Sequence, residues 1–109
     1  MQVHKTGCYA VVFTSKRNTE DGEGYEQMAQ QMVDLAQTQP GFLGIDGARG
    51  GDGVGITVSY WERLEDIEAW RRNGAHLAAQ AQGKARWYEA FSLHICRVER
   101  AYGFLKAAQ

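Results

Sequence analysis

The residues best suited to chemistry gather in one part of the chain, residues 54–91. This stretch holds all three tryptophans and one of the three histidines. An unperturbed imidazole has a pKa near ~6.5 and can take up a proton at neutral pH. His76 is therefore the candidate general base, and Trp70, six residues earlier, completes the candidate catalytic pair. Aromatic rings beside an imidazole fit a pocket for a small planar molecule, and they fit a well-filled core equally well.

Four further side chains in this stretch could bind such a molecule. Tyr60 or Arg86 could hold an anionic oxygen, while Trp61 and Trp87 could stack on a planar ring. Each has a plainer explanation. The tryptophans could anchor the core, His76 could be a capped or solvent-edge histidine, and a solvated or ion-paired arginine would contribute little.

Other catalytic and ligand-binding patterns are absent from the sequence. It contains no GxSxG nucleophile elbow and no HExxH zinc motif. Cys8 and Cys96 are far apart and fit no CxxC spacing, and with three scattered histidines they predict no metal site. No GxGxxG or GxxxxGK[ST] motif leads from a strand into a helix, which argues against nucleotide binding.

Composition narrows the class of protein further. The formal net charge of -1, with both signs interspersed, gives no electrostatic case for nucleic acid or an anionic membrane. The longest apolar runs are far shorter than the roughly 20 residues that span a bilayer. The first residues do not resemble a signal peptide, so we predict a cytoplasmic protein. Its 109 residues predict one domain, 1–109, with a core over about residues 6–104.

Periodicity predicts four strands and two helices. Alternating apolar residues predict strands at residues 8–15, 42–49, 54–61 and 91–100. Helical spacing predicts one helix from Tyr25 to Ala36, and a second from about residue 64 that bends or breaks at Asn73 and Gly74 and resumes over residues 75–82. Gly83 is expected to end this helix and leave residues 84–90 short-helical or irregular.

The predicted order is βαββαβ. Four strands with two helices on one face of an antiparallel sheet give an α+β, ferredoxin-like sandwich. The strand over residues 8–15 is apolar on both faces. Residues 54–61 place Val54, Ile56, Val58 and Tyr60 on one face and Thr57, Ser59 and Trp61 on the other. An exposed apolar sheet face is unusual for a soluble monomer. We therefore expect a homodimer joined through the sheet face.

Several segments together resemble the antibiotic biosynthesis monooxygenase superfamily. They are PGFLG at 40–44, ITVSYWERLEDIEAW at 56–70, AHLAAQ at 75–80 and RVERAYGF at 97–104. The resemblance implies a dimeric α+β barrel with a small-ligand cavity between sheet and helices in each subunit. It also implies a choice of activities, from oxygenation of aromatic polyketides and quinols without a bound cofactor to haem degradation.

The haem-degrading branch can be compared position by position. It has an Asn on the first strand, a Trp early in the second helix and a His ten residues later. Trp70 fits the second position, but Gln80 stands at the third and the first strand has no Asn. Haem degradation is therefore disfavoured. The expected function is a cofactor-independent monooxygenase acting on a planar phenol, quinol or polyketide-like aromatic. The alternative is a non-catalytic, ligand-binding or stress-related dimer, with a haem-binding member as the less favoured third choice. The sequence leaves open whether the chain is an enzyme.

Overall fold

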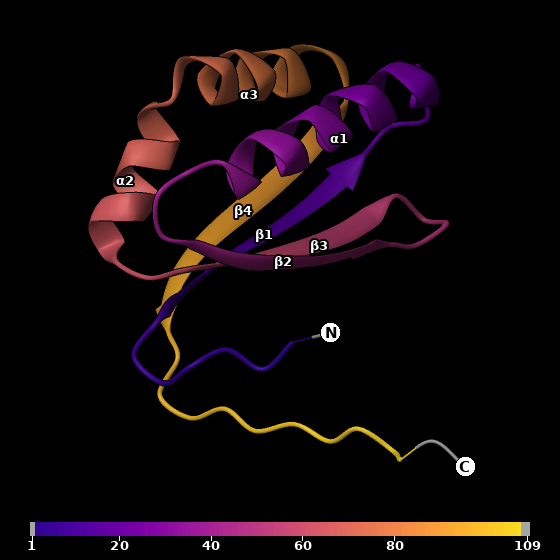
Figure 1. The fold of residues 1–109 in the computed structure, drawn as a ribbon. Coiled ribbons are helices and arrows are strands. Elements are labelled where there is room, and N and C mark those ends of the chain that lie inside the picture. Colours follow the sequence, from indigo (N-terminus) through magenta and orange to yellow (C-terminus); the bar gives the residue numbers. More distant parts are fainter. Residues whose placement is uncertain (1, 108–109) are drawn as a thin grey trace.

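The protein is described by a computed structural model, in which residues 2–107 are placed. Its elements follow in the order β1 (Tyr9–Arg17), α1 (Gly22–Gln37), β2 (Phe42–Arg49), β3 (Val54–Trp61), α2 (Leu64–Arg72), α3 (Gly74–Arg86) and β4 (Tyr88–Arg97). The strands form one antiparallel sheet in the order β2-β3-β1-β4 (Figure 1). The predicted α+β, ferredoxin-like fold is confirmed.

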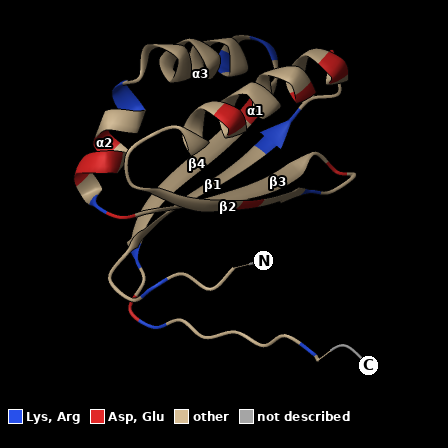
Figure 2. Cartoon of the chain, viewed as in Figure 1, with Lys and Arg blue, Asp and Glu red and all other residues tan. Residues whose placement is uncertain are grey.

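The helices all cover one face of the sheet, so alternate strand residues divide between helices and the opposite face (Figure 1). On β1, Val11 and Phe13 lie under the helices. Phe13 is paired with Thr57 of β3 on one side and Leu93 of β4 on the other. Figure 2 shows charged residues mainly on the helices, loops and terminal segments, with few on the strands. The sheet is therefore largely uncharged on both faces.

The break expected at Asn73 and Gly74 is present, but it is a single residue, because α3 already begins at Gly74. Asn73 ends α2 and caps α3, where its Oδ1 accepts hydrogen bonds from the amides of Ala75 and His76 at 3.0 and 3.2 Å. Such a cap satisfies amides that have no partner within the helix. Its backbone, at φ −59° and ψ 127°, is not helical, so the chain turns between the two helices.

The predicted end of this helix at Gly83 is wrong. The helix continues to Arg86, and β4 begins at Tyr88 rather than at residue 91 and ends at Arg97 rather than at residue 100. Gly83 is buried, and a Cβ there would lie 2.6 Å from the Tyr88 ring. The glycine is therefore needed for close packing of the ring on the helix, which outweighs its weak helix propensity.

The two terminal segments leave the sheet on the side away from the helices (Figure 1). Near the N-terminus, His4 is buried and its ring stacks on Tyr60 at 3.9 Å between centroids. Beyond β4, the chain is extended, and Tyr102 and Phe104 are 95% and 88% exposed. Within residues 2–107, no helix is long and apolar enough to cross a membrane.

Candidate functional site

A cavity of about 250 Å³ lies between the sheet and the helices. Its walls come from every helix and strand, and they are mostly apolar, with Met28, Met32 and Val33 of α1 among them. Small-molecule sites have this character, with a few polar groups that orient the ligand. Two groups of polar side chains are joined by hydrogen bonds, one around His76 and one around Tyr88, while Arg71, Thr57 and Ser59 also line the cavity.

The first group is centred on a stacked pair. The rings of Trp70 and His76 lie 4.1 Å apart between centroids and are inclined by only 14°. In one continuous helix, residues six apart would point in widely different directions. The break at Asn73 removes that restriction and lets the start of α3 place His76 on Trp70.

The hydrogen bonds of His76 define its tautomer. Nδ1 lies 3.0 Å from the carbonyl oxygen of Trp70. A carbonyl oxygen can only accept, so Nδ1 of the neutral ring carries the hydrogen and Nε2 carries the lone pair. Nε2 lies 3.5 Å from the amide nitrogen of Gln80, which also lines the cavity. His76 therefore presents an unprotonated nitrogen, held in orientation by a backbone group.

The surroundings of His76 favour its neutral form. Burial lowers the pKa of its imidazole below the usual 6.5, and the hydrogen bond to the Trp70 carbonyl opposes this only in part. Burial disfavours the charged ring because the cavity solvates an imidazolium poorly. At neutral pH the side chain is therefore a base ready to accept a proton.

An aromatic column continues from this pair into the core. The ring of Trp61 lies 5.9 Å from that of Trp70, and Phe42 meets Trp61 edge to face at 5.3 Å. Trp61 is fully buried, and its indole Nε1–H donates to Ser59 Oγ at 2.9 Å. Trp61 thus lines the cavity and is also part of the buried core, and its stacking on a ligand stays a prediction.

The second polar group was not predicted from the sequence. The hydroxyls of Tyr25 and Tyr88 lie 3.1 Å apart, and Arg49 donates to Tyr25 at 3.2 Å. Burial, followed by the hydrogen bond to Tyr25, raises the pKa of Tyr88 well above its usual value. Tyr88 therefore presents a neutral, protonated hydroxyl at the cavity wall. One sequence feature could have indicated this group. Tyr25 begins the apolar stripe of its helix, and a buried phenol hydroxyl needs a hydrogen-bond partner.

Three of the predicted binding residues lie outside the cavity lining. Tyr60 is on the opposite face of the sheet, stacked on His4. Arg86 is exposed, where it pairs with Asp21 at 2.8 Å. Trp87 is buried against Tyr25, with ring centroids 5.6 Å apart. For these three residues the structure supports packing or surface pairing rather than contact with a ligand in this cavity.

No cluster of three or more His, Cys, Asp or Glu side chains able to hold a metal ion occurs among residues 2–107. Cys8 is buried, Cys96 is exposed, and neither forms a disulfide. The cavity lining combines apolar and aromatic side chains with the His76 imidazole, the Gln80 amide, several hydroxyls and the Arg71 guanidinium, a set that suits an organic ligand.

Comparison with known proteins identifies the family. The family model for antibiotic biosynthesis monooxygenase matches residues 8–82, which include β1 through most of α3. The chain belongs to the antibiotic biosynthesis monooxygenase family. A curated relative, the uncharacterized protein YqjZ of Bacillus subtilis, is 45% identical over 92 residues, which cover 84% of this chain and 80% of YqjZ. Because YqjZ is itself uncharacterized, this match indicates no activity for the chain.

Solved structures of the family share the fold. The structure of SnoaB, a cofactor-independent oxygenase from Streptomyces nogalater, matches with a TM-score of 0.74 over 87% of this chain and 96% of that one, at 11% identity. A putative antibiotic biosynthesis monooxygenase from Nitrosomonas europaea matches with the same TM-score over 86% of this chain and 92% of that one, at 11% identity. At such low identity, the likeness concerns the fold alone.

Proposed function

We propose that this chain is a monooxygenase that uses no bound cofactor and acts on a small planar phenol or quinol. The observation that carries the proposal is the orientation of His76, whose Nδ1–H donates to the Trp70 carbonyl and whose unprotonated Nε2 lies beside the Gln80 amide in a mostly apolar cavity. Family membership and the cofactor-independent oxygenase SnoaB, which has the same fold, support this choice of chemistry.

The proposed reaction starts with proton transfer. Nε2 of His76 takes the phenolic proton, and the resulting anion is electron-rich enough to reduce dioxygen. One oxygen atom then bonds to a ring carbon and the other leaves as water. The substrate loses four electrons in forming a quinone, and dioxygen gains the same four. A dry cavity shields the reactive intermediates from side reactions, while Trp70 stacks on the planar ring.

Cavity size restricts the substrate. A cavity of roughly 150 Å³ lined by apolar residues holds benzene, and the cavity here is about 250 Å³. That volume favours one or two fused rings over a four-ring polyketide. Hydroxylated naphthalenes are therefore the compounds to test first.

The test is oxygen uptake with ¹⁸O₂ and a panel of one- to four-ring phenols. We expect enzyme-dependent uptake with one- and two-ring substrates, one labelled atom in each quinone formed and the other in water. Saturable binding of these compounds without oxygen uptake beyond their spontaneous oxidation would instead support the second candidate function, a non-catalytic ligand-binding protein that uses the same cavity.

We also propose that two copies join through the sheet face opposite the helices. This face carries Ile56, which is 49% exposed, and Val54, which is 40% exposed. The extended segment after β4 adds Tyr102, Phe104 and Leu105, all nearly fully exposed. Apolar side chains gathered this way are typical of an interface, and a two-fold axis would bury the same surface on both copies.

A further inference from the structure

Two arginines lie against a single tyrosine ring at the end of β1 and β2. The guanidinium carbon of Arg17 is 4.2 Å from the centroid of the Tyr25 ring, and that of Arg49 is 5.6 Å from it. Neither arginine forms an ion pair with any carboxylate in the described part of the chain. Two like charges are thus held close together, and both are at least partly buried.

Arg49 is fixed by neutral acceptors. It donates to the Ser15 hydroxyl at 2.6 Å, to the Ser15 carbonyl at 3.2 Å, and to the carbonyl of Gly53. To reach β1 its side chain crosses β3 at Gly55, where a Cβ would lie 2.6 Å from the guanidinium carbon. These hydrogen bonds position the side chain but leave its positive charge uncompensated.

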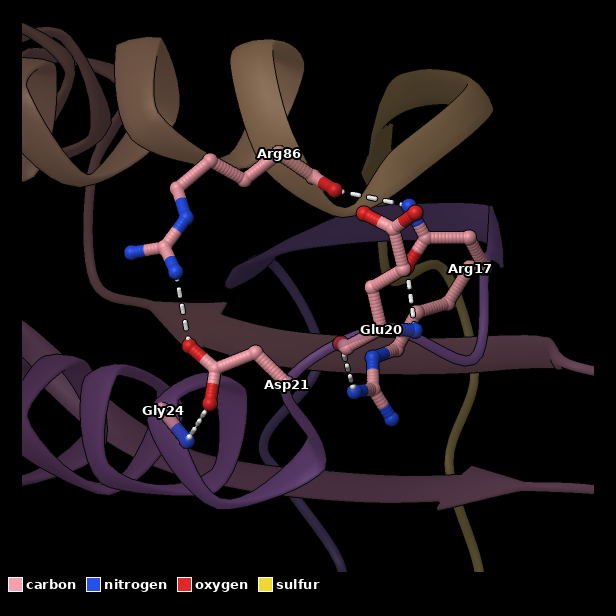
Figure 3. Close-up of polar contacts among 6 residues, drawn as sticks. Arg17, Glu20, Asp21, Gly24 and Arg86 are labelled. Atoms are coloured by element: carbon pink, nitrogen blue, oxygen red, sulfur yellow. Dashed lines mark hydrogen bonds and ion pairs between the residues drawn. The ribbon is translucent and has the colours of Figure 1, made fainter.

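Arg17 is less fully bonded. One of its terminal nitrogens donates to the carbonyl oxygen of Glu20 at 3.2 Å, as Figure 3 shows. Its Nε–H is shielded from solvent and has no acceptor among residues 2–107. The carboxylate of Asp21 does not neutralise it, because that group pairs with Arg86 at 2.8 Å and accepts from the Gly24 amide at 3.1 Å (Figure 3).

A polar cavity of about 300 Å³ opens beside the two arginines. The loop after β1 and the turn at residues 50–53 form the rest of its wall. Asp52 supplies the single carboxylate of the lining, and its Oδ1 already accepts from the Val54 amide at 3.0 Å. Two guanidinium groups against one carboxylate leave the cavity with a net positive charge. The two cavities share no lining residue, although Arg49 of this cavity donates to the Tyr25 hydroxyl of the other.

We propose that this second cavity binds a small oxyanion, a phosphate or a carboxylate, with Arg17 as the contacting residue and Arg49 as the fixed second charge. Guanidinium groups form charge-assisted hydrogen bonds to both kinds of anion, and their planar shape matches two oxygen atoms at once. A ligand of this kind would supply the negative charge that the described protein groups do not. The proposal is independent of the oxygenase chemistry, because no residue of the His76 group lines this cavity.

The test is a titration of the full chain at low ionic strength with inorganic phosphate, sulfate and acetate. Binding is followed by calorimetry and by NMR shifts of the Gly51 and Gly53 amides. We expect saturable binding, with the amide shifts confined to the turn and the loop after β1. The order of affinities for phosphate and acetate decides which oxyanion the site prefers.

Substitutions separate a built site from general attraction to positive charge. Arg17→Gln is expected to weaken binding at least about tenfold, and Arg17→Lys by less, since it keeps the charge but loses the planar fork. Arg72→Gln removes one equally charged side chain, 73% exposed on α2, and should leave affinity unchanged. Thermal unfolding checks that each variant folds. Absence of saturable binding, or equal weakening in Arg17→Gln and Arg72→Gln, would overturn the proposal.

Discussion

The imidazole of His76 is held by Trp70 in two ways, since the indole ring stacks on it at 4.1 Å and the carbonyl oxygen of the same residue accepts from its Nδ1 at 3.0 Å. One residue therefore sets both the plane and the tautomer of the candidate base. Both contacts come from the chain itself, so the ring is held in one orientation by Trp70 alone. Such preorganisation is what general base catalysis requires.

Asn73 is expected to matter for activity although it does not line the cavity. Replacing it with Ala removes the acceptor of the Ala75 and His76 amides. Loss of such a cap costs about 1 kcal/mol of stability, and it frees the start of α3 that carries His76. We expect urea denaturation to show this loss and kcat/KM to fall. Asn73→Ser keeps a capping oxygen and should stay near the wild type in both measurements. Equal activity of the two variants would show that the cap does not position His76.

Removal of the base tests the proposed chemistry directly. Asn at position 76 can still donate to the Trp70 carbonyl but has no basic nitrogen. His76→Asn is therefore expected to lower the rate of oxygen uptake by about 10²–10⁴-fold while the fold is kept. Gln82→Ala is the control, because Gln82 is exposed on the same helix as His76 and does not line the cavity. Unchanged uptake in His76→Asn would remove His76 from the role of base.

The pH dependence should carry the signature of a buried neutral histidine. Since burial lowers the pKa of His76 below 6.5, kcat/KM should rise with pH through a midpoint below that value. The free energy of unfolding should likewise increase as pH rises toward 6.5. The unfolded chain takes up a proton near pH ~6.5 while the folded chain resists it, so the free energy of unfolding falls as pH drops below 6.5.

Comparison with His76→Asn isolates this contribution. The variant should lose part of the decrease in stability between pH 6.5 and more acid conditions, as followed by urea midpoints. A midpoint of kcat/KM above pH 6.5 would contradict the lowered pKa of His76.

The fold and half of the candidate site could be predicted from the sequence. Alternation along residues 54–61 correctly placed Tyr60 and Trp61 on opposite faces, but it could not show which face the cavity adjoins. The Trp70 and His76 spacing became informative only with the break at Asn73. The pair of hydroxyls at Tyr25 and Tyr88 joins α1 to β4, 63 residues apart, and no local pattern records such a contact.

Dimer formation is expected to depend on the segment after β4. Sedimentation of the full chain should give a mass near twice 12.2 kDa. Replacing Tyr102, Phe104 and Leu105 with Ser removes most of the exposed apolar surface of this segment, and burial of such side chains contributes roughly 1.5–3 kcal/mol each. The dissociation constant of the variant dimer should therefore be much higher than that of the wild type. A full chain that sediments as a monomer would contradict the dimer, and an unaffected dimer would confine the interface to the sheet.

Gly83 and Gly74 provide a matched pair, because both lie in α3 and neither has positive φ. An added Cβ at Gly83 would meet the Tyr88 ring at 2.6 Å, whereas one at Gly74 would meet nothing within 4 Å. Gly83→Ala is expected to destabilise the protein by about 1–3 kcal/mol through overpacking. Gly74→Ala should be neutral or stabilise it by up to about 1 kcal/mol, because it restricts the unfolded chain.

Urea denaturation of the two variants measures the difference. Because Tyr88 lines the cavity, Gly83→Ala should also raise KM for the phenol substrate, whereas Gly74→Ala should not. If Gly83→Ala instead matches Gly74→Ala in stability, the Tyr88 ring can shift without cost. That result would contradict the claim that close packing of the Tyr88 ring requires a glycine at position 83.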